Sequence, residues 1–134
     1  MSNKNISAAK SKVFVYWITT GFLCLGMIGG GIAQLMHAKP NVEGMLHLGY
    51  PLYLLNLLGI WKIAGAIAIL VPGFLLVKEW AYAGLFFAMT GAVVSHIASG
   101  DAVQLWIASF VFAMLVVISW YSRPDNRKLN VSKM

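Results

Sequence analysis

Four long runs of apolar residues alternate with short polar stretches along the chain. This pattern predicts membrane-spanning helices over residues 13–36, 52–71, 80–98 and 102–121, because about 20 apolar residues cross the hydrocarbon layer of a bilayer. Polar, basic tails at residues 1–12 and 122–134 flank the transmembrane domain at 13–121, and we expect the first tail to be disordered. Short connections follow the second and third runs, so the predicted fold class is an all-α integral membrane four-helix bundle.

The longest connection, residues 37–51, is too apolar to be a free linker. Apolar residues at Val42, Met45, Leu46 and Leu48 predict a short interfacial or re-entrant helix between the first two spans. Pro51 suits the start of the helix that follows, where a backbone N–H is not needed.

Composition supports the membrane assignment and excludes several other classes. Apolar residues make up 60% of the chain and charged residues only 10%, whereas a soluble domain carries about 25% charged residues. The net charge is +6, but the basic residues flank the apolar runs and form no basic face, so we expect no nucleic-acid partner. The single cysteine, Cys24, excludes an internal disulfide and argues against a self-contained thiol–disulfide enzyme.

The distribution of basic residues predicts an orientation. Four crossings put both termini on one side, and that side holds eight Lys and Arg residues against Lys39 on the other. By the positive-inside rule, both termini are expected in the cytoplasm. The eight are Lys4, Lys10, Lys12, Lys78, Arg123, Arg127, Lys128 and Lys133.

Small residues within the runs predict sites of close helix packing. Gly26 and Gly30 have the G-x-x-x-G spacing and could form a dimer seam. The first run is long for a signal-peptide core, so we expect it to be retained, although Gly31 and Ala33 resemble a cleavage site. The predicted packing glycines are Gly26, Gly30, Gly59, Gly65, Gly84 and Gly91.

Lys62, in the middle of the second span, is the strongest candidate functional residue. A lysine at this depth costs several kcal/mol and needs a partner, a wet cavity or a lost proton. The predicted topology also gathers polar groups toward the side opposite the termini, which suggests a cavity that opens there with Lys62 at its floor. The candidate pocket residues are Lys62, Asn56, His96, Asp101, Gln34, Gln104 and Glu43.

Other interpretations of these polar residues remain open. Lys62 could be structural, bonded to carbonyl groups or stacked on an aromatic ring such as Trp61. Histidines near helix ends are often interfacial, and the spacing of the three histidines gives no helical metal-binding pair, so no metal ligands are assigned. Ser95 and His96 are adjacent on a helix and point about 100° apart, which argues against a catalytic triad with Asp101.

Residues 48–123 carry several spaced motifs in register. The motifs are Leu48-Gly49-Tyr50-Pro51, residues 58–66 (LGIWKIAGA), Pro72, residues 78–84 (KEWAYAG), Thr90-Gly91-Ala92, Ser95-His96 and Gly100-Asp101. In these motifs the chain resembles the DoxX-like family of small bacterial membrane proteins. The resemblance implies a four-helix membrane bundle in a bacterial inner membrane, and it adds Glu79 to Lys62, His96 and Asp101 as candidate site positions.

The resemblance implies little about activity. The family is named after a membrane subunit associated with thiosulfate:quinone oxidoreductase, and most members have no assigned reaction. Related thiol-dependent quinone reductases use paired cysteines, which this chain lacks. We therefore expect an accessory protein or a bundle that binds a small molecule, a quinone or a lipid, and that is not an enzyme on its own. The alternatives are a subunit of a quinone-linked oxidoreductase and a small exporter or permeation protein.

The expected partners are the lipid bilayer and either further copies of the chain or a membrane enzyme. A quinone is the candidate cofactor, although no residue pattern in the sequence demonstrates one.

Overall fold

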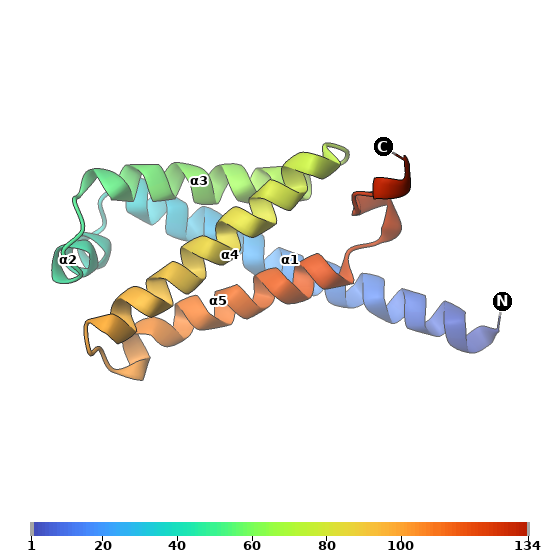
Figure 1. Ribbon diagram of the computed structural model, residues 1–134, viewed down its shortest axis with the longest axis horizontal. Coiled ribbons are helices and arrows are strands. Elements are labelled where there is room, and N and C mark those ends of the chain that lie inside the picture. Colours follow the sequence, from blue (N-terminus) through green and yellow to red (C-terminus); the bar gives the residue numbers. More distant parts are fainter. Residues whose placement is uncertain (1, 134) are drawn as a thin grey trace.

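A computed structural model describes residues 2–133, and five α-helices account for most of them (Figure 1). Four are long: α1 (Asn3–Leu35), α3 (Tyr53–Leu70), α4 (Leu75–Ala98) and α5 (Val103–Ser122). The short helix α2 (Lys39–His47) joins α1 to α3, and two 3-10 turns, η1 (Asp125–Arg127) and η2 (Val131–Lys133), follow α5. The four long helices are long and apolar enough to cross a membrane, as the hydrophobic pattern predicts.

The long helices pack in a ring of antiparallel neighbours. Helix α1 contacts α3 and α5, and α4 contacts the same two helices. Both termini and the α3–α4 turn lie at one end of the bundle, which we call the terminal end (Figure 1). Helix α2 and the α4–α5 turn lie at the other, called here the opposite end.

The core of the bundle consists of buried, mostly apolar side chains from all four long helices. Large apolar residues on the outer faces remain exposed, as expected for helices whose solvent is lipid. Cys24 is one of the buried core residues. The core residues are Leu23, Cys24, Met27, Ala66, Ile69, Tyr82, Leu85, Met89, Ala113 and Val116.

Two helices begin earlier than the hydrophobic pattern indicated. Residues 3–12 continue α1 as a regular helix rather than forming a disordered tail, because alanine and lysine favour helix once an adjoining span has nucleated it. Helix α4 begins at Leu75 rather than near residue 80, so Lys78 and Glu79 lie inside it. The short helix expected between the first two spans is present as α2.

Backbone chemistry fixes the turn between α3 and α4. Pro72 cannot donate the N–H that would continue α3, and Gly73 adopts a φ of 79°, a conformation open to glycine. Phe74 then adopts a φ of 49° just before α4 begins. This turn brings the N-terminal part of α4 back against the last carbonyl groups of α3.

Candidate functional site

A cavity of about 420 Å³ lies between the four long helices in the half of the bundle near the opposite end. Helix α2 forms part of its wall through Pro40, Asn41, Gly44 and Met45. The remaining wall is mostly apolar and comes from all four long helices. Those residues include Gly26, Met27, Gly30, Gln34, Leu55, Leu58, Lys62, Ala88, Met89, Ala92, His96, Leu105, Ala108, Ser109 and Phe112. We refer to this space as the central cavity.

Three of the seven candidate pocket residues line the central cavity: Lys62 from α3, Gln34 from α1 and His96 from α4. Gln34 is only 6% exposed, and its Oε1 is the one buried side-chain oxygen or nitrogen among residues 2–133 without a hydrogen-bond partner. Buried polar atoms are nearly always paired, so an unpaired amide oxygen in a cavity wall is an exception that calls for an explanation.

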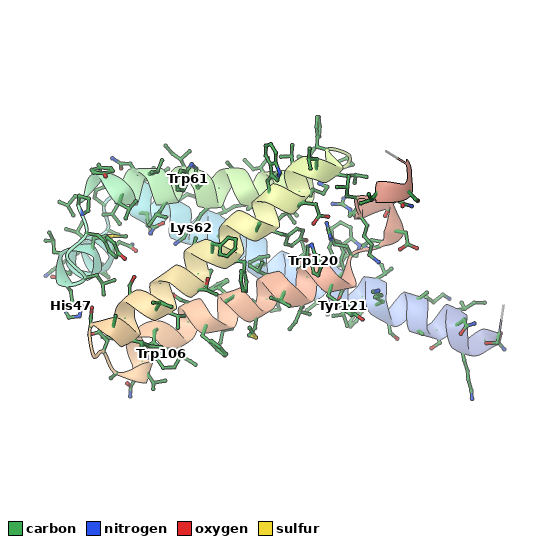
Figure 2. All side chains as sticks on the ribbon, in the orientation of Figure 1. His47, Trp61, Lys62, Trp106, Trp120 and Tyr121 are labelled. Carbon is green, nitrogen blue, oxygen red and sulfur yellow. The ribbon has the colours of Figure 1, made fainter. Side chains whose placement is uncertain are left out.

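Lys62 lines two separate spaces. Figure 2 labels its side chain on α3 next to Trp61. A second groove of about 460 Å³ runs between α3 and α4, and it shares Leu58, Lys62 and Ala88 with the central cavity. Trp61 and Trp80 line this lateral groove, and both are more than half exposed on the outer face of the bundle. The half-buried Lys62 therefore borders an apolar groove on one side and a partly polar cavity on the other.

Asp101 lies outside the cavity wall but is linked to it through His96. His96 Nδ1 donates a hydrogen bond to Asp101 Oδ2 at 2.7 Å, and His47 Nε2 donates to Oδ1 of the same carboxylate at 2.7 Å. These two hydrogen bonds hold the pKa of Asp101 below its usual value. They also tie the end of α2 to the α4–α5 turn.

The other three candidates are exposed and do not line the cavity. Asn56 Oδ1 accepts a hydrogen bond of 2.9 Å from His37 Nε2. Glu43 forms a 3.8 Å pair with Lys39 along the exposed face of α2, a geometry that contributes little to stability. Gln104 is exposed near the start of α5.

The geometry also bears on the alternative interpretations. Within residues 2–133, no group of three or more His, Cys, Asp or Glu side chains is arranged to hold a metal ion. Ser95 donates to the carbonyl of Gly91 at 2.9 Å and its hydroxyl is 2.7 Å from that of Tyr50. Its hydrogen bonds therefore do not join those of His96 and Asp101.

Comparison with known proteins identifies the family. The sequence profile of the DoxX-like family matches residues 18–119, which is most of the chain. The chain belongs to the DoxX-like family. It is also similar to the uncharacterized protein YdgD of Bacillus subtilis (strain 168), with 31% identity over 105 residues that cover 73% of this chain and 91% of the relative. No solved structure matches.

Family membership confirms the resemblance noted in the sequence. Together with the four apolar helices, it makes this DoxX-like protein a multi-pass membrane protein. It indicates no specific activity, and the relative is itself uncharacterized.

The predicted packing glycines divide into two groups in this DoxX-like protein. Gly59 meets Gly31 at the α1–α3 crossing, where a Cβ added to either would lie 2.8 Å from the carbonyl oxygen of the other. Gly26 packs against the ring of Phe112, and Gly65 packs against Leu85. The positions of Gly30, Gly84 and Gly91 have no atoms within 4 Å of an added Cβ.

Sequence reasoning missed Lys78, the most buried charged residue among those whose burial the structure describes. Lys78 has no exposed surface, and its ammonium group donates to the carbonyl oxygens of Ala68 at 2.6 Å, Ile69 at 3.1 Å and Val71. The last carbonyl groups of a helix have no partner within the helix, and Pro72 offers no N–H to Ala68. Lys78 therefore caps the C-terminus of α3. Its position soon after Pro72-Gly73 was the available signal.

Arg127 completes the same cap from the far end of the chain. Its guanidinium donates to the carbonyl of Ile69 at 2.9 Å and to that of Leu70 at 3.2 Å. It also lies over the rings of Tyr16 and Trp17, with its central carbon 5.9 and 4.9 Å from their centroids. The C-terminal segment thus contacts α1 and α3 together.

Glu79, a candidate by family resemblance, also belongs to the terminal end rather than to the central cavity. Its carboxylate accepts hydrogen bonds from Arg123 at 2.6 Å and from the indole of Trp120 at 2.8 Å. Nearby, the buried hydroxyl of Ser119 lies 2.7 Å from that of Thr20 and 2.8 Å from that of Tyr82. Together, the hydrogen bonds of Glu79 and Ser119 join α1, α4 and α5, which indicates a structural role for Glu79.

Proposed function

We propose that this DoxX-like protein binds a small membrane-soluble molecule in the central cavity, and that a quinone is the best candidate. The observation that carries the proposal is the unpaired, buried oxygen of Gln34 in the same wall as Lys62 and His96. A pocket with an apolar lining and a few convergent polar groups is the usual form of a small-molecule site.

The polar groups are suited to an oxygen-bearing ring. The Lys62 ammonium can donate to a carbonyl oxygen, and the Gln34 carbonyl can accept from a hydroxyl. With Nδ1 of His96 engaged by Asp101, Nε2 of that ring is the nitrogen left for a ligand. A molecule that alternates between carbonyl and hydroxyl forms, as a quinone and a quinol do, would use both kinds of group.

The lateral groove supports a ligand with an apolar tail. It opens between α3 and α4 and shares Leu58, Lys62 and Ala88 with the cavity wall, so we infer that a chain attached to a bound ring could extend toward the bilayer. A lipid whose head group enters the cavity would fit the same description, and it is the alternative ligand of this proposal.

Mass spectrometry of organic extracts tests the proposal directly. Wild-type protein and the variants Lys62→Met and Gln34→Leu would be purified identically in mild detergent. We expect a stoichiometric quinone in the wild type and its loss from both variants. A third variant, Lys39→Met, removes an exposed lysine outside the cavity and is expected to retain the ligand. Only bulk lipid in every sample would refute quinone binding and favour a structural or accessory role.

A subunit of a quinone-linked oxidoreductase is the second candidate, and the His96–Asp101 pair favours it. Asp101 lies in the turn at the opposite end, and His96 lines the cavity, so the pair offers a short path for a proton between that surface and a bound quinone. An accompanying membrane enzyme would supply the electrons. Co-purification with a redox enzyme, lost in His96→Gln, is the expected result for this candidate.

We also propose that the protein resides in a bacterial inner membrane with both termini in the cytoplasm. The basic residues of the terminal end support this orientation by the positive-inside rule. Cysteines introduced at Lys4 and Lys128 should react with an impermeant reagent only from the cytoplasmic side, once Cys24 has been replaced. Labelling from outside would reverse the orientation.

A further inference from the structure

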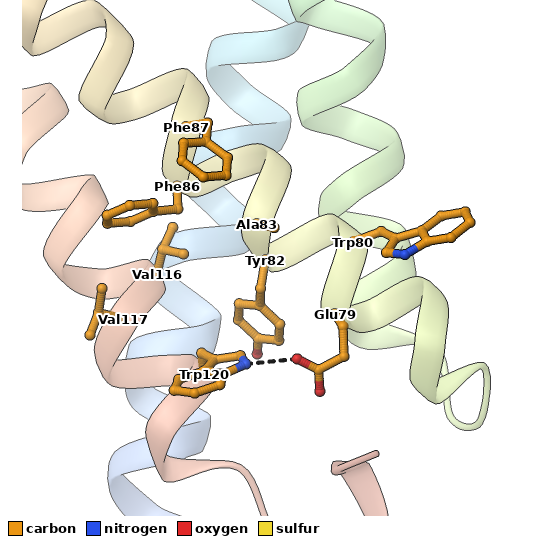
Figure 3. A pocket seen from close by; sticks show the side chains of 9 residues that line it. All are labelled: Glu79, Trp80, Tyr82, Ala83, Phe86, Phe87, Val116, Val117 and Trp120. Atoms are coloured by element: carbon orange, nitrogen blue, oxygen red, sulfur yellow. Dashed lines mark hydrogen bonds between the residues drawn. The ribbon is translucent and has the colours of Figure 1, made fainter. Parts of the chain in front are cut away.

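Another apolar groove, of about 510 Å³, lies between α4 and α5 near the terminal end, separate from both the central cavity and the lateral groove. Figure 3 shows Phe86 and Phe87 at one end of this groove and Trp120 at the other. Trp120 donates its indole N–H to Glu79 Oε2 at 2.8 Å, and this hydrogen bond marks the polar limit of the groove. We call this space the α4–α5 groove.

A basic pocket of about 480 Å³ adjoins the α4–α5 groove and shares Glu79 and Trp120 with it. Besides Glu79 of α4, three separate parts of the chain form this pocket: the N-terminal extension of α1, the end of α5 and the C-terminal segment. They contribute Lys12, Tyr121, Arg123, Lys128, Leu129 and Val131.

The basic pocket has an excess of positive charge. Glu79 and Arg123 neutralise each other across 2.6 Å. Lys128 lies 3.3 Å from Asp125, but that carboxylate is fully exposed and does not line the pocket, so the pair is weak. Lys12 is exposed, and its ammonium group lies 5.1 Å from the centroid of the Tyr121 ring. Two lysines are therefore left to attract an anion.

We propose that an anionic phospholipid binds at this junction, with an acyl chain in the α4–α5 groove and its phosphate in the basic pocket. The arrangement matches that of a lipid, because the apolar groove adjoins a cationic pocket through the shared residues Glu79 and Trp120. Trp120 and Tyr121 lie where the two meet, and such aromatic residues favour the level of the lipid head groups. A helix of a partner protein would fill the groove but would leave the two lysines unmatched.

Native mass spectrometry of the full-length protein in mild detergent can test this site. The probes are dioleoylphosphatidylglycerol and dioleoylphosphatidylcholine, which share acyl chains and differ in head-group charge. We expect the wild type to retain one phosphatidylglycerol in preference to phosphatidylcholine. Each lysine near an anionic head group accounts for about a fivefold change in affinity, so Lys12→Gln with Lys128→Gln should lower retention by about 30-fold.

Two controls separate the site from nonspecific attraction. Lys4→Gln with Lys10→Gln removes the same charge from the exposed part of α1, outside the pocket, and should keep the preference for phosphatidylglycerol. Ala83→Phe places a ring in the α4–α5 groove and should reduce retention of both lipids.

Several results would overturn the proposal. They are equal retention of the two lipids by the wild type, an unchanged preference in the variant that lacks both Lys12 and Lys128, and displacement of the lipid by equimolar inorganic phosphate. A change of oligomeric state in Ala83→Phe, with lipid retention unaltered, would assign the groove to a protein contact instead. None of these results bears on quinone binding in the central cavity.

Discussion

Replacement of Lys78 by methionine tests the physical account of how α3 ends. Methionine preserves most of the side-chain volume but donates no hydrogen bond. The carbonyl of Ile69 keeps its bond from Arg127, whereas those of Ala68 and Val71 lose the donor that Lys78 supplies. Pro72 offers the carbonyl of Ala68 no replacement. The substitution therefore leaves two carbonyl groups at the end of α3 without this partner.

The expected cost follows from these two groups. A buried carbonyl left unpaired costs about 1–3 kcal/mol, and both bonds are partly buried, so the loss is about 3 kcal/mol in total. Removal of a buried ammonium group from its apolar surroundings returns part of that energy, since burial of a charge is itself unfavourable. We expect a net destabilisation of about 2 kcal/mol.

Equilibrium unfolding in mixed micelles of mild detergent and sodium dodecyl sulfate would measure this difference. The five tryptophans provide a fluorescence signal. Lys10→Met, on the exposed part of α1, is the matched control and should change the unfolding free energy by less than about 0.5 kcal/mol. If Lys78→Met is as stable as this control, the cap at α3 does not stabilise the bundle and the reasoning is wrong.

Two further predictions concern the α1–α3 crossing and the opposite end. Gly59→Ala should lower the free energy of unfolding by about 1–3 kcal/mol, because the added Cβ would press on the backbone of Gly31. Gly29→Ala, where the added Cβ meets open space, should not destabilise the bundle. Unfolding in detergent compares the two variants, and equal stability would refute the close crossing. The pKa of Asp101 is lower in the folded protein than in the unfolded chain. The ionised Asp101 carboxylate therefore stabilises the fold above about pH 4, and this contribution is lost as the pH falls further. Melting temperatures between pH 2.5 and 6 should therefore depend less on pH in Asp101→Asn, and identical profiles would count against this role.

The hydrophobic pattern was sufficient to predict the four long helices and the short helix between the first two. The length of an apolar run must match the thickness of the bilayer, so such runs predict spanning helices directly. The apolar residues of the first connection also predicted α2. The depth of Lys62 in its span likewise pointed to an internal space, and Lys62, Gln34 and His96 do line one cavity.

The pattern failed where a side chain's partner lies elsewhere in the chain. From the sequence, Lys78 counts only among the basic residues that flank the spans. Pro72-Gly73 marks a turn before it, but a turn does not show that the end of α3 folds back onto its ammonium group. The predicted topology places Asn56 in the pocket, yet its side chain is exposed and pairs with His37. Spacing defines a helical face, but only the packing of the neighbouring helices decides which face is buried.

The cap on α3 has a consequence for the synthesis of this protein. Arg127 binds carbonyl groups that precede it by 57 and 58 residues, and two transmembrane helices separate the two positions. A ribosome therefore releases α3 into the membrane long before the arginine that completes its end has been made. The nascent bundle lacks this contact at the terminal end until Arg127 has emerged. A chain truncated just after α5 would keep every span and still lack the closure that joins the third helix to the first.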